Sequence, residues 1–365
     1  MHLLDFVFGL AARGPRFFQD GWGDRALCEA MDPVALARRR IPRLTVHLGP
    51  ARREHGGLLR EGAFESPEVR LPPCARTARI RLLLPERGVR AVALHLAASG
   101  DQGFGVRTRF AAQLLERGIG ALVLENAYYG ARRPPNQPRH AFRSISDLHL
   151  MGAATFQEGR ALLRWVKERL RVPLVGITGY SMGGQLSAMV GASLPFPCAV
   201  VPVAAPCSPA SVLREGVLHH VAEWEAIAGR GGDVAAAREA LCQHLARFSV
   251  TTLPPPVWPH AAVVVGTRED GVVPPADQER IARHWGAELR WLPAGHVSAV
   301  FRHQGEMRAA IADAFDRLEA ARAIRSARWG HARRRAAGSA PRGPGAPPSE
   351  AARARAPGRA AGPRT

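Results

Sequence analysis

Lysine is almost absent from this chain, although the chain is strongly basic. Its 365 residues include 50 lysines and arginines against 31 acidic residues, and Lys167 is the only lysine. Residues 323–365 hold ten arginines and a single acid, Glu350. A basic arm can associate with nucleic acid or anionic lipid, but a solvated, disordered arm is the favoured interpretation. We therefore do not expect a nucleic-acid partner.

Cysteine is also scarce. The five cysteines are scattered along the chain, and no Cys-x-x-Cys pair occurs among them. This pattern supports neither a zinc site nor a disulfide framework, so we expect no metal and no other cofactor. A reducing compartment is the default for such a sequence, and we predict a cytoplasmic protein.

Long apolar runs are missing as well. No stretch approaches the length of a transmembrane helix. The first ten residues are apolar, but Asp5 interrupts them and no basic region precedes them, so they do not resemble a signal peptide. A helix that packs on the body of the protein is the favoured interpretation of this segment. Weak amphipathic contact with a membrane surface is the alternative.

The most informative motif that is present is Gly179-Tyr180-Ser181-Met182-Gly183. It follows the strand-like apolar run 174–178 and precedes a helix-compatible run, 184–190. A serine at such a strand-to-helix turn presents its hydroxyl above the sheet, and the flanking glycines tolerate the crowding there. This nucleophile elbow predicts an α/β-hydrolase fold with Ser181 as the nucleophile. A turn serine that only caps a helix is the less favoured alternative.

Two further motifs follow in the order that α/β-hydrolases use. The apolar run 263–265 leads to a turn with Asp270, and the strand-like run 288–292 leads to a turn with His296. We expect His296 to accept the proton of Ser181 and return it to the leaving group, while Asp270 orients the histidine. Glu269 is an adjacent competitor for the acid. Asp270 as a plain turn former and His296 as a helix-start residue are the structural alternatives.

Backbone groups near the elbow are expected to form the oxyanion hole. The N–H of Met182 is the first predicted donor, and the N–H of Ala97, at the end of a strand-like run, is the second. We expect a structural role for His95. Cys207 and Ser99 are weaker rival nucleophiles because neither has the context of an elbow.

A loop after the strand-like run 121–124 is the predicted substrate contact. Tyr128, Tyr129 and Arg132 in this loop are expected to line a pocket, since arginine suits a carboxylate or phosphate. A plain connecting loop is about as well supported by the sequence.

Apolar runs alternate with helical patterns through most of the chain. This alternation predicts an α/β fold, a mostly parallel sheet with helices on both faces. Residues 206–258 interrupt the pattern and are predicted to form a helical cap insertion. We therefore predict a helical segment at 1–42, an α/β-hydrolase domain at 43–322 that contains the cap, and a basic, disordered tail at 323–365.

The chain resembles the family of alpha/beta hydrolase domain-containing protein 18. The resemblance runs from about residue 16 to about residue 318. The matching residues are Phe17-Phe18, Gly21-Trp22-Gly23, Leu94-His95-Leu96-Ala97, Gly100-Asp101, Leu124-Glu125-Asn126, Tyr128-Tyr129-Gly130, Ser146-Asp147-Leu148, Met151-Gly152, Ser181-Met182-Gly183-Gly184, Glu269-Asp270, Pro274, Gly295-His296 and Ser298-Ala299. The resemblance implies an α/β-hydrolase fold, a triad of Ser181, Asp270 and His296 and, by analogy, action on lipid esters. The family pattern has glycine where this chain has Ala98, and the animal proteins have a longer cap.

The leading functional hypothesis is a cofactor-free serine hydrolase that cleaves carboxylic esters, with acyl lipids among them, through an acyl-enzyme. The expected partner is thus a small-molecule or lipid ester. A peptidase or amidase with the same triad is the second hypothesis. A non-catalytic protein that keeps the fold for binding is the third, and the complete triad argues against it. The sequence does not predict the oligomeric state.

Overall fold

The computed structural model describes residues 2–5 and 16–338, with side chains described as far as residue 326. Contacts divide the chain into a first unit, Met1–Ala321, and a second unit, Arg322–Thr365. Within the described residues, no helix combines the length and the apolar character that crossing a bilayer requires.

A ten-stranded sheet forms the centre of the first unit. Its strand order is β1-β3-β4-β6-β5-β7-β8-β9-β10, with β2 paired to β3. β3 is antiparallel to β4 and β4 to β6, whereas all neighbours from β6 to β10 are parallel. The carboxyl ends of the parallel strands therefore meet at one edge, where open α/β sheets bind ligands. The strands are β1 (His47–Leu48), β2 (Arg52–Glu54), β3 (Gly57–Glu65), β4 (Thr77–Leu84), β5 (Ala91–Leu96), β6 (Ile119–Leu124), β7 (Leu174–Tyr180), β8 (Ala199–Val203), β9 (Val263–Thr267) and β10 (Glu288–Leu292).

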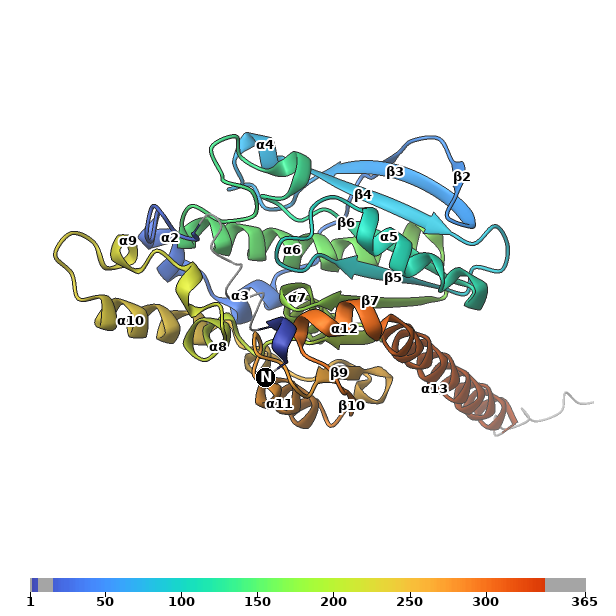
Figure 1. The fold of residues 1–365 in the computed structure, drawn as a ribbon. Helices are drawn as coiled ribbons and strands as arrows, with labels where there is room; N and C mark the ends of the chain where they lie inside the picture. The colour runs from blue at the N-terminus through green and yellow to red at the C-terminus, as the bar shows by residue number, and fades with distance from the viewer. Residues whose placement is uncertain (1, 6–15, 339–365) are drawn as a thin grey trace, which may run out of the picture. The chain divides into compact units, whose positions relative to one another are not determined.

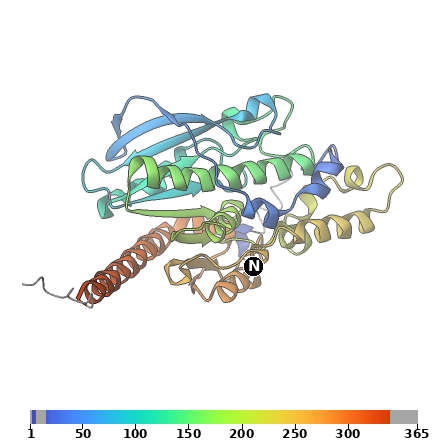
Figure 2. The same ribbon diagram turned by 180° about the vertical axis from the view of Figure 1, so that it is seen from behind.

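Helices cover both faces of this sheet. α5 lies toward the viewer in Figure 1, and α6 crosses the opposite face, which Figure 2 shows. The α-helices are α2 (Arg25–Ala30), α3 (Pro33–Arg38), α4 (Pro73–Arg76), α5 (Gly105–Ala112), α6 (Ile145–Trp165), α7 (Met182–Ala192), α8 (Pro209–Arg214), α9 (Trp224–Ala228), α10 (Val234–Ala246), α11 (Pro275–Trp285), α12 (His296–Arg302) and α13 (Gln304–Gly338). Short helical turns lie at η1 (Leu115–Arg117), η2 (Gly130–Arg132), η3 (Val166–Leu170), η4 (His219–Val221), η5 (Val250–Thr252) and η6 (Pro259–Ala261). The predicted α/β-hydrolase architecture is confirmed.

Alternate residues of the central strands face different layers of the core. Leu94 and Leu96 of β5 pack in a cluster with side chains of α6 and α7, whereas Ala91 and Ala93 pack with the first half of α13. Successive side chains of a strand point to opposite faces, so both faces of β5 are buried. Burial on both faces is the reason these strands are continuous apolar runs in the sequence.

The residues between β8 and β9 form a helical insertion that contains α8, α9 and α10. It lies at the left of Figure 1. The N–H of Val217 donates to the carbonyl of Gly271 at 2.9 Å, and Phe17 exchanges backbone hydrogen bonds with Val221 and Glu223 at 2.8 Å each. The insertion is thus tied both to the loop after β9 and to the segment before α2.

The basic tail differs from its prediction. We expected disorder from residue 323 onward, but α13 continues to Gly338, so residues 323–338 are helical. Alanine and arginine dominate this stretch, and both are strong helix formers. Residues 339–365 lie outside the described residues.

The first part of the chain is less helical than predicted. Among the described residues before residue 43, helix is limited to residues 3–5, α2 and α3. Asp24 and Asp32 begin α2 and α3, because their carboxylates accept backbone N–H groups of the first turn. Most of the apolar segment at residues 1–10 lies outside the described residues.

Candidate active site

Ser181 occupies the turn between β7 and α7. Its backbone has φ 55° and ψ −119°. Non-glycine residues rarely adopt such dihedrals, and holding them costs on the order of 1–3 kcal/mol. The N–H of Ser181 donates to the carbonyl of Val203 on β8 at 2.9 Å. A strained serine between a buried strand and a helix is the geometry of a nucleophile elbow.

Close backbone packing explains the glycines on either side of Ser181. A Cβ atom at Gly179 would lie 2.3 Å from the carbonyl oxygen of Gly183. A Cβ atom at Gly183 would lie 2.6 Å from the carbonyl oxygen of Leu96 and 2.7 Å from that of Ala97. The elbow therefore packs directly against the end of β5, and a larger residue at either glycine would force the backbones apart.

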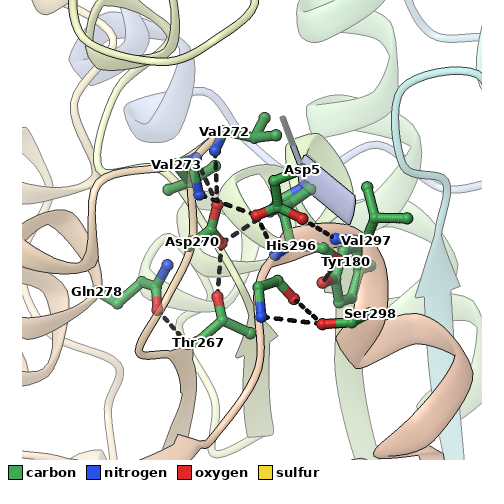
Figure 3. A network of polar contacts seen from close by, with 12 residues as sticks. Asp5, Tyr180, Thr267, Asp270, Val272, Val273, Gln278, His296, Val297 and Ser298 are labelled. Atoms are coloured by element: carbon green, nitrogen blue, oxygen red, sulfur yellow. Dashed lines mark hydrogen bonds and ion pairs between the residues drawn. The ribbon is translucent and has the colours of Figure 1, made fainter. Parts of the chain in front are cut away.

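Asp270 and His296 form a buried pair beyond the ends of β9 and β10. Nδ1 of His296 lies 2.8 Å from Oδ2 of Asp270, and the contact is drawn in Figure 3. Because a carboxylate can only accept, Nδ1 carries the hydrogen, and Nε2 of the neutral ring is left as an acceptor. The side chain of Asp270 is fully buried and that of His296 nearly so. This is the tautomer that a general base needs.

The carboxylate of Asp270 receives four hydrogen bonds, at 2.5 to 2.9 Å. Donors to a carboxylate stabilise its charged form. The adjacent acid, Glu269, is exposed to solvent. Of the two candidate acids, Asp270 is therefore the one placed on the histidine. Its donors are the backbone N–H groups of Val272 and Val273, the hydroxyl of Thr267 and Nδ1 of His296.

Tyr180 connects the elbow to the histidine. Its hydroxyl donates to the carbonyl oxygen of His296 at 2.5 Å, and the two ring centroids are 5.1 Å apart. Burial, with the nearby charges of Asp270 and Asp5, raises the pKa of Tyr180, so the hydroxyl keeps its proton. Ser181 follows Tyr180 directly, and it therefore lies at the same edge of the sheet as the histidine. Neither Oγ of Ser181 nor Nε2 of His296 is hydrogen-bonded to another described residue.

Both predicted oxyanion residues lie at the elbow. Met182 is the first residue of α7, so its N–H has no acceptor within the helix. Ala97 is fully buried and directly follows β5, where Leu96 pairs with Gly179 of β7. The carbonyl of Ala97 also lies against Gly183, as described above. Backbone from two elements thus converges beside Ser181.

The structure does not place Arg132 in a substrate pocket. Its side chain is only 1% exposed, and its guanidinium contacts both carboxylate oxygens of Glu158, at 2.6 and 3.0 Å. The remaining donors bind the carbonyl oxygens of Ala75 and Glu125. A guanidinium this fully paired has no donor left for a substrate, so Arg132 is a structural residue, which corrects the expectation from the sequence.

Tyr128 and Tyr129 are also buried inside the protein. Tyr129 is fully buried, its ring packs against Phe142, and burial raises its pKa to about 12. Tyr128 packs against the same phenylalanine with φ 65°, and burial and Asp147 raise its pKa. Neither ring lines an open surface, so the alternative of a connecting loop fits this segment better than the predicted pocket does.

The rival nucleophiles and the other nearby histidine have ordinary environments. Cys207 is buried with its Sγ 3.2 Å from Oγ of Ser249, and Ser99 is exposed. His95 is buried against Phe110, and burial with the charge of Arg107 lowers its pKa to about 3, so its ring is neutral. Across the described ranges, no group of three or more His, Cys, Asp or Glu side chains is arranged to hold a metal ion.

Asp5 is the site residue that sequence reasoning missed. Its carboxylate accepts the backbone N–H groups of Gly271, His296 and Val297 at 2.7 to 2.9 Å. Figure 3 shows Asp5 beside His296 and Val297. In the sequence, Asp5 had only interrupted an apolar run. A charged residue within an otherwise apolar segment was the one available signal that this position has a buried partner.

A family model covers most of the chain. The model for alpha/beta hydrolase domain containing 18 matches residues 15–232 and 228–317. The matched residues include the elbow, the acid and the histidine.

Three solved structures with a similar fold are named as two acetyl xylan esterases and one hydrolase. Acetyl xylan esterase 1 from Thermoanaerobacterium sp. JW/SL YS485 aligns with a TM-score of 0.59 and 15% identity, over 86% of this chain and 99% of its own. An acetyl xylan esterase from Paenibacillus sp. R4 aligns with a TM-score of 0.56 and 14% identity, over 85% of this chain and 99% of its own. An S-formylglutathione hydrolase from Agrobacterium tumefaciens aligns with a TM-score of 0.50 and 13% identity, over 74% of this chain and 99% of its own. At such identities the similarity establishes the fold alone.

Proposed function

Because the chain belongs to the alpha/beta hydrolase domain containing 18 family, we propose that it is a serine hydrolase that cleaves carboxylic esters. The observation that carries the proposal is the strained Ser181 at an elbow whose neighbour Tyr180 contacts His296, itself paired with the buried Asp270. Each part has a place in acyl transfer, and the family match spans all of them.

The first half of the reaction acylates the serine. Oγ of Ser181 attacks the carbonyl carbon of the ester while its proton moves to Nε2 of His296. The oxygen that becomes negative is bound by the N–H groups of Met182 and Ala97. The bond to the leaving alkoxide then breaks, and Nε2 returns the proton to it. Asp270 holds the tautomer and stabilises the imidazolium.

The second half releases the acid. A water molecule gives one proton to Nε2 of His296 and attacks the acyl carbon. The bond between that carbon and Oγ breaks, the carboxylic acid leaves, and Ser181 recovers its proton from the imidazolium. We expect a hydrogen bond from Oγ of Ser181 to Nε2 of His296 to form when substrate binds, because catalytic hydrogen bonds often tighten only in the Michaelis complex.

The substrate class is proposed as esters ahead of amides. The names of the structurally similar proteins make short acyl esters the first compounds to test. Acyl lipids are included in the proposal because the helical insertion between β8 and β9 contacts the loop that carries Asp270. The contact is the hydrogen bond between Val217 and Gly271. Leu213 and Leu245 belong to that insertion, and both side chains are buried.

The test is ester turnover by the wild type and by Ser181→Ala. p-Nitrophenyl esters of increasing acyl length and the matching anilides would be compared, with Ser193→Ala, at the other end of α7, as the control. We expect turnover of the esters to fall by about 10⁴-fold or more in Ser181→Ala and to remain in the control. Full activity of Ser181→Ala would refute the proposal. Preference for the anilides would replace it with an amidase.

A further inference from the structure

Asp5 holds the backbone that presents the histidine. We propose that Asp5 is a positioning residue for His296, and this inference rests on the proposed function. Its Oδ2 accepts the N–H of His296 at 2.7 Å and that of Gly271 at 2.9 Å, while its Oδ1 accepts the N–H of Val297 at 2.8 Å. One carboxylate thereby joins the loop after Asp270 to the start of the helix that carries His296.

The burial of Asp5 makes these bonds strong. The residue is 0% exposed, and an unpaired carboxylate in such a place would be very costly. Hydrogen bonds to a charged acceptor are roughly twice as strong as those between neutral groups. The carboxylate therefore fixes the three N–H groups to one another, although Asp5 and His296 are 291 positions apart in the sequence.

Tight packing holds the same segment in place. The N–H of His2 donates to the carbonyl of Glu269 at 2.9 Å, one residue before Asp270. A Cβ atom at Gly295 would lie 2.3 Å from Cβ of His2 and 2.7 Å from Oδ2 of Asp5. Glycine at position 295 is therefore what allows Asp5 to approach the histidine backbone. Residues 2–5 therefore lie between the loop that carries Asp270 and the turn that precedes His296.

The backbone of His296 is consequently held from both sides. Asp5 accepts its N–H, and the hydroxyl of Tyr180 donates to its carbonyl oxygen at 2.5 Å. With its backbone fixed, the imidazole can turn only about its side-chain bonds, and Asp270 fixes that turn at Nδ1. Loss of Asp5 frees the backbone without touching the reacting atoms. A misplacement of about 1 Å can cost on the order of 100-fold in rate.

The experiment uses the full chain with Asp5→Ala, Asp5→Asn and the control Leu3→Ala. Leu3 lies in the same segment but is 71% exposed. Asparagine keeps the shape and one acceptor oxygen, so Asp5→Asn decides the question if Asp5→Ala does not fold. The measurements are kcat and KM for a p-nitrophenyl ester, the low-field proton resonance of Nδ1 of His296, and amide hydrogen exchange at residues 295–297.

We expect Asp5→Ala to lower kcat by about ten- to a hundredfold with KM within about twofold, with Asp5→Asn between it and the wild type. The low-field resonance should weaken or shift, amide exchange at residues 295–297 should accelerate, and Leu3→Ala should match the wild type. Unchanged kcat and an unchanged resonance in a folded Asp5 variant would overturn the inference. If Ser181→Ala keeps full activity, the proposed function fails, but the resonance and the exchange rates still decide the role of Asp5.

Discussion

The two halves of the candidate site are held by different forces. The elbow around Ser181 is fixed by steric crowding, because the backbones of β5, β7 and α7 approach so closely that glycine is required at positions 179 and 183. The Asp270–His296 pair is fixed by polar contacts, which include four donors to Asp270 and two bonds to the backbone of His296. Crowding leaves a local signature in the sequence, whereas a polar network collects its members from distant places.

This difference explains what a substitution should do in each half. A change in the elbow should disturb packing and therefore stability together with activity. A change in the polar half should affect the rate more than the stability when the altered group faces the histidine.

Asp270→Asn should cause the largest loss of activity, because it disrupts the Asp270–His296 pair. An amide cannot accept from all four donors and would turn its own N–H₂ group toward Nδ1 of His296, which favours the wrong tautomer. We expect kcat to fall by about 10⁴-fold, by analogy with the same change in serine protease triads. Ester turnover measures this, with Glu269→Gln as the exposed neighbour. Comparable losses in the two variants, or a folded Asp270→Asn enzyme within tenfold of the wild type, would contradict the assignment of the acid.

Arg132→Leu should show that a polar network away from the reaction acts on stability alone. The buried ion pair with Glu158 would lose one partner, and an unpaired buried charge typically costs about 3–5 kcal/mol. The adjacent Arg133 is exposed, so Arg133→Leu should stay within about 0.5 kcal/mol. Urea unfolding measures both. A stable Arg132→Leu protein with a raised KM would instead restore the substrate role that the sequence suggested.

Gly183→Ala should destabilise the crowded elbow around Ser181. The new methyl group would meet the carbonyl oxygens of Leu96 and Ala97, and overpacking of this kind costs about 1–3 kcal/mol. Gly152 is also helical, but nothing lies within 4 Å of a Cβ atom there, so Gly152→Ala should stabilise the protein by about 0.5–1 kcal/mol. Thermal unfolding and ester turnover would be compared. The steric account fails if the two alanines behave alike.

His95→Leu tests the effect of a buried histidine on the pH dependence of stability. Among the described residues, His296 is paired with the carboxylate of Asp270, whereas His95 has no such carboxylate partner. Burial lowers the pKa of His95 to about 3, whereas an unfolded histidine titrates near 6.5. Between pH 6.5 and pH 3 the histidine is protonated in the unfolded chain but stays neutral in the folded protein. The free energy of unfolding therefore falls as the pH drops from 6.5 toward 3. At pH 5 this loss is about 2 kcal/mol, and His95→Leu should remove it.

Urea unfolding at pH 7 and pH 5 checks this prediction. The difference in unfolding free energy between the two pH values should shrink in His95→Leu and stay as in the wild type in His219→Leu, whose side chain is exposed. An equal pH dependence in all three proteins would mean that His95 can be protonated without unfolding.

The sequence predicted those features whose signals are local. The strands of the central sheet are apolar on both faces, and the elbow occupies five consecutive residues, so both could be recognised. Asp270 was predicted as the acid with Glu269 as a competitor, because two adjacent acids differ only in which one the fold turns inward. Asp5 and the Arg132–Glu158 pair were missed for a related reason. Their partners lie 291 and 26 residues away, and no spacing rule connects them.

Mass spectrometry of the wild type and of Ser181→Ala after treatment with a fluorophosphonate would locate the adduct and so identify the nucleophile. The account predicts one adduct, on the peptide that contains Ser181, formed rapidly in the wild type and absent from the variant. An adduct on Ser99 or Cys207, or equal labelling of the two proteins, would show that the nucleophile is not at the elbow.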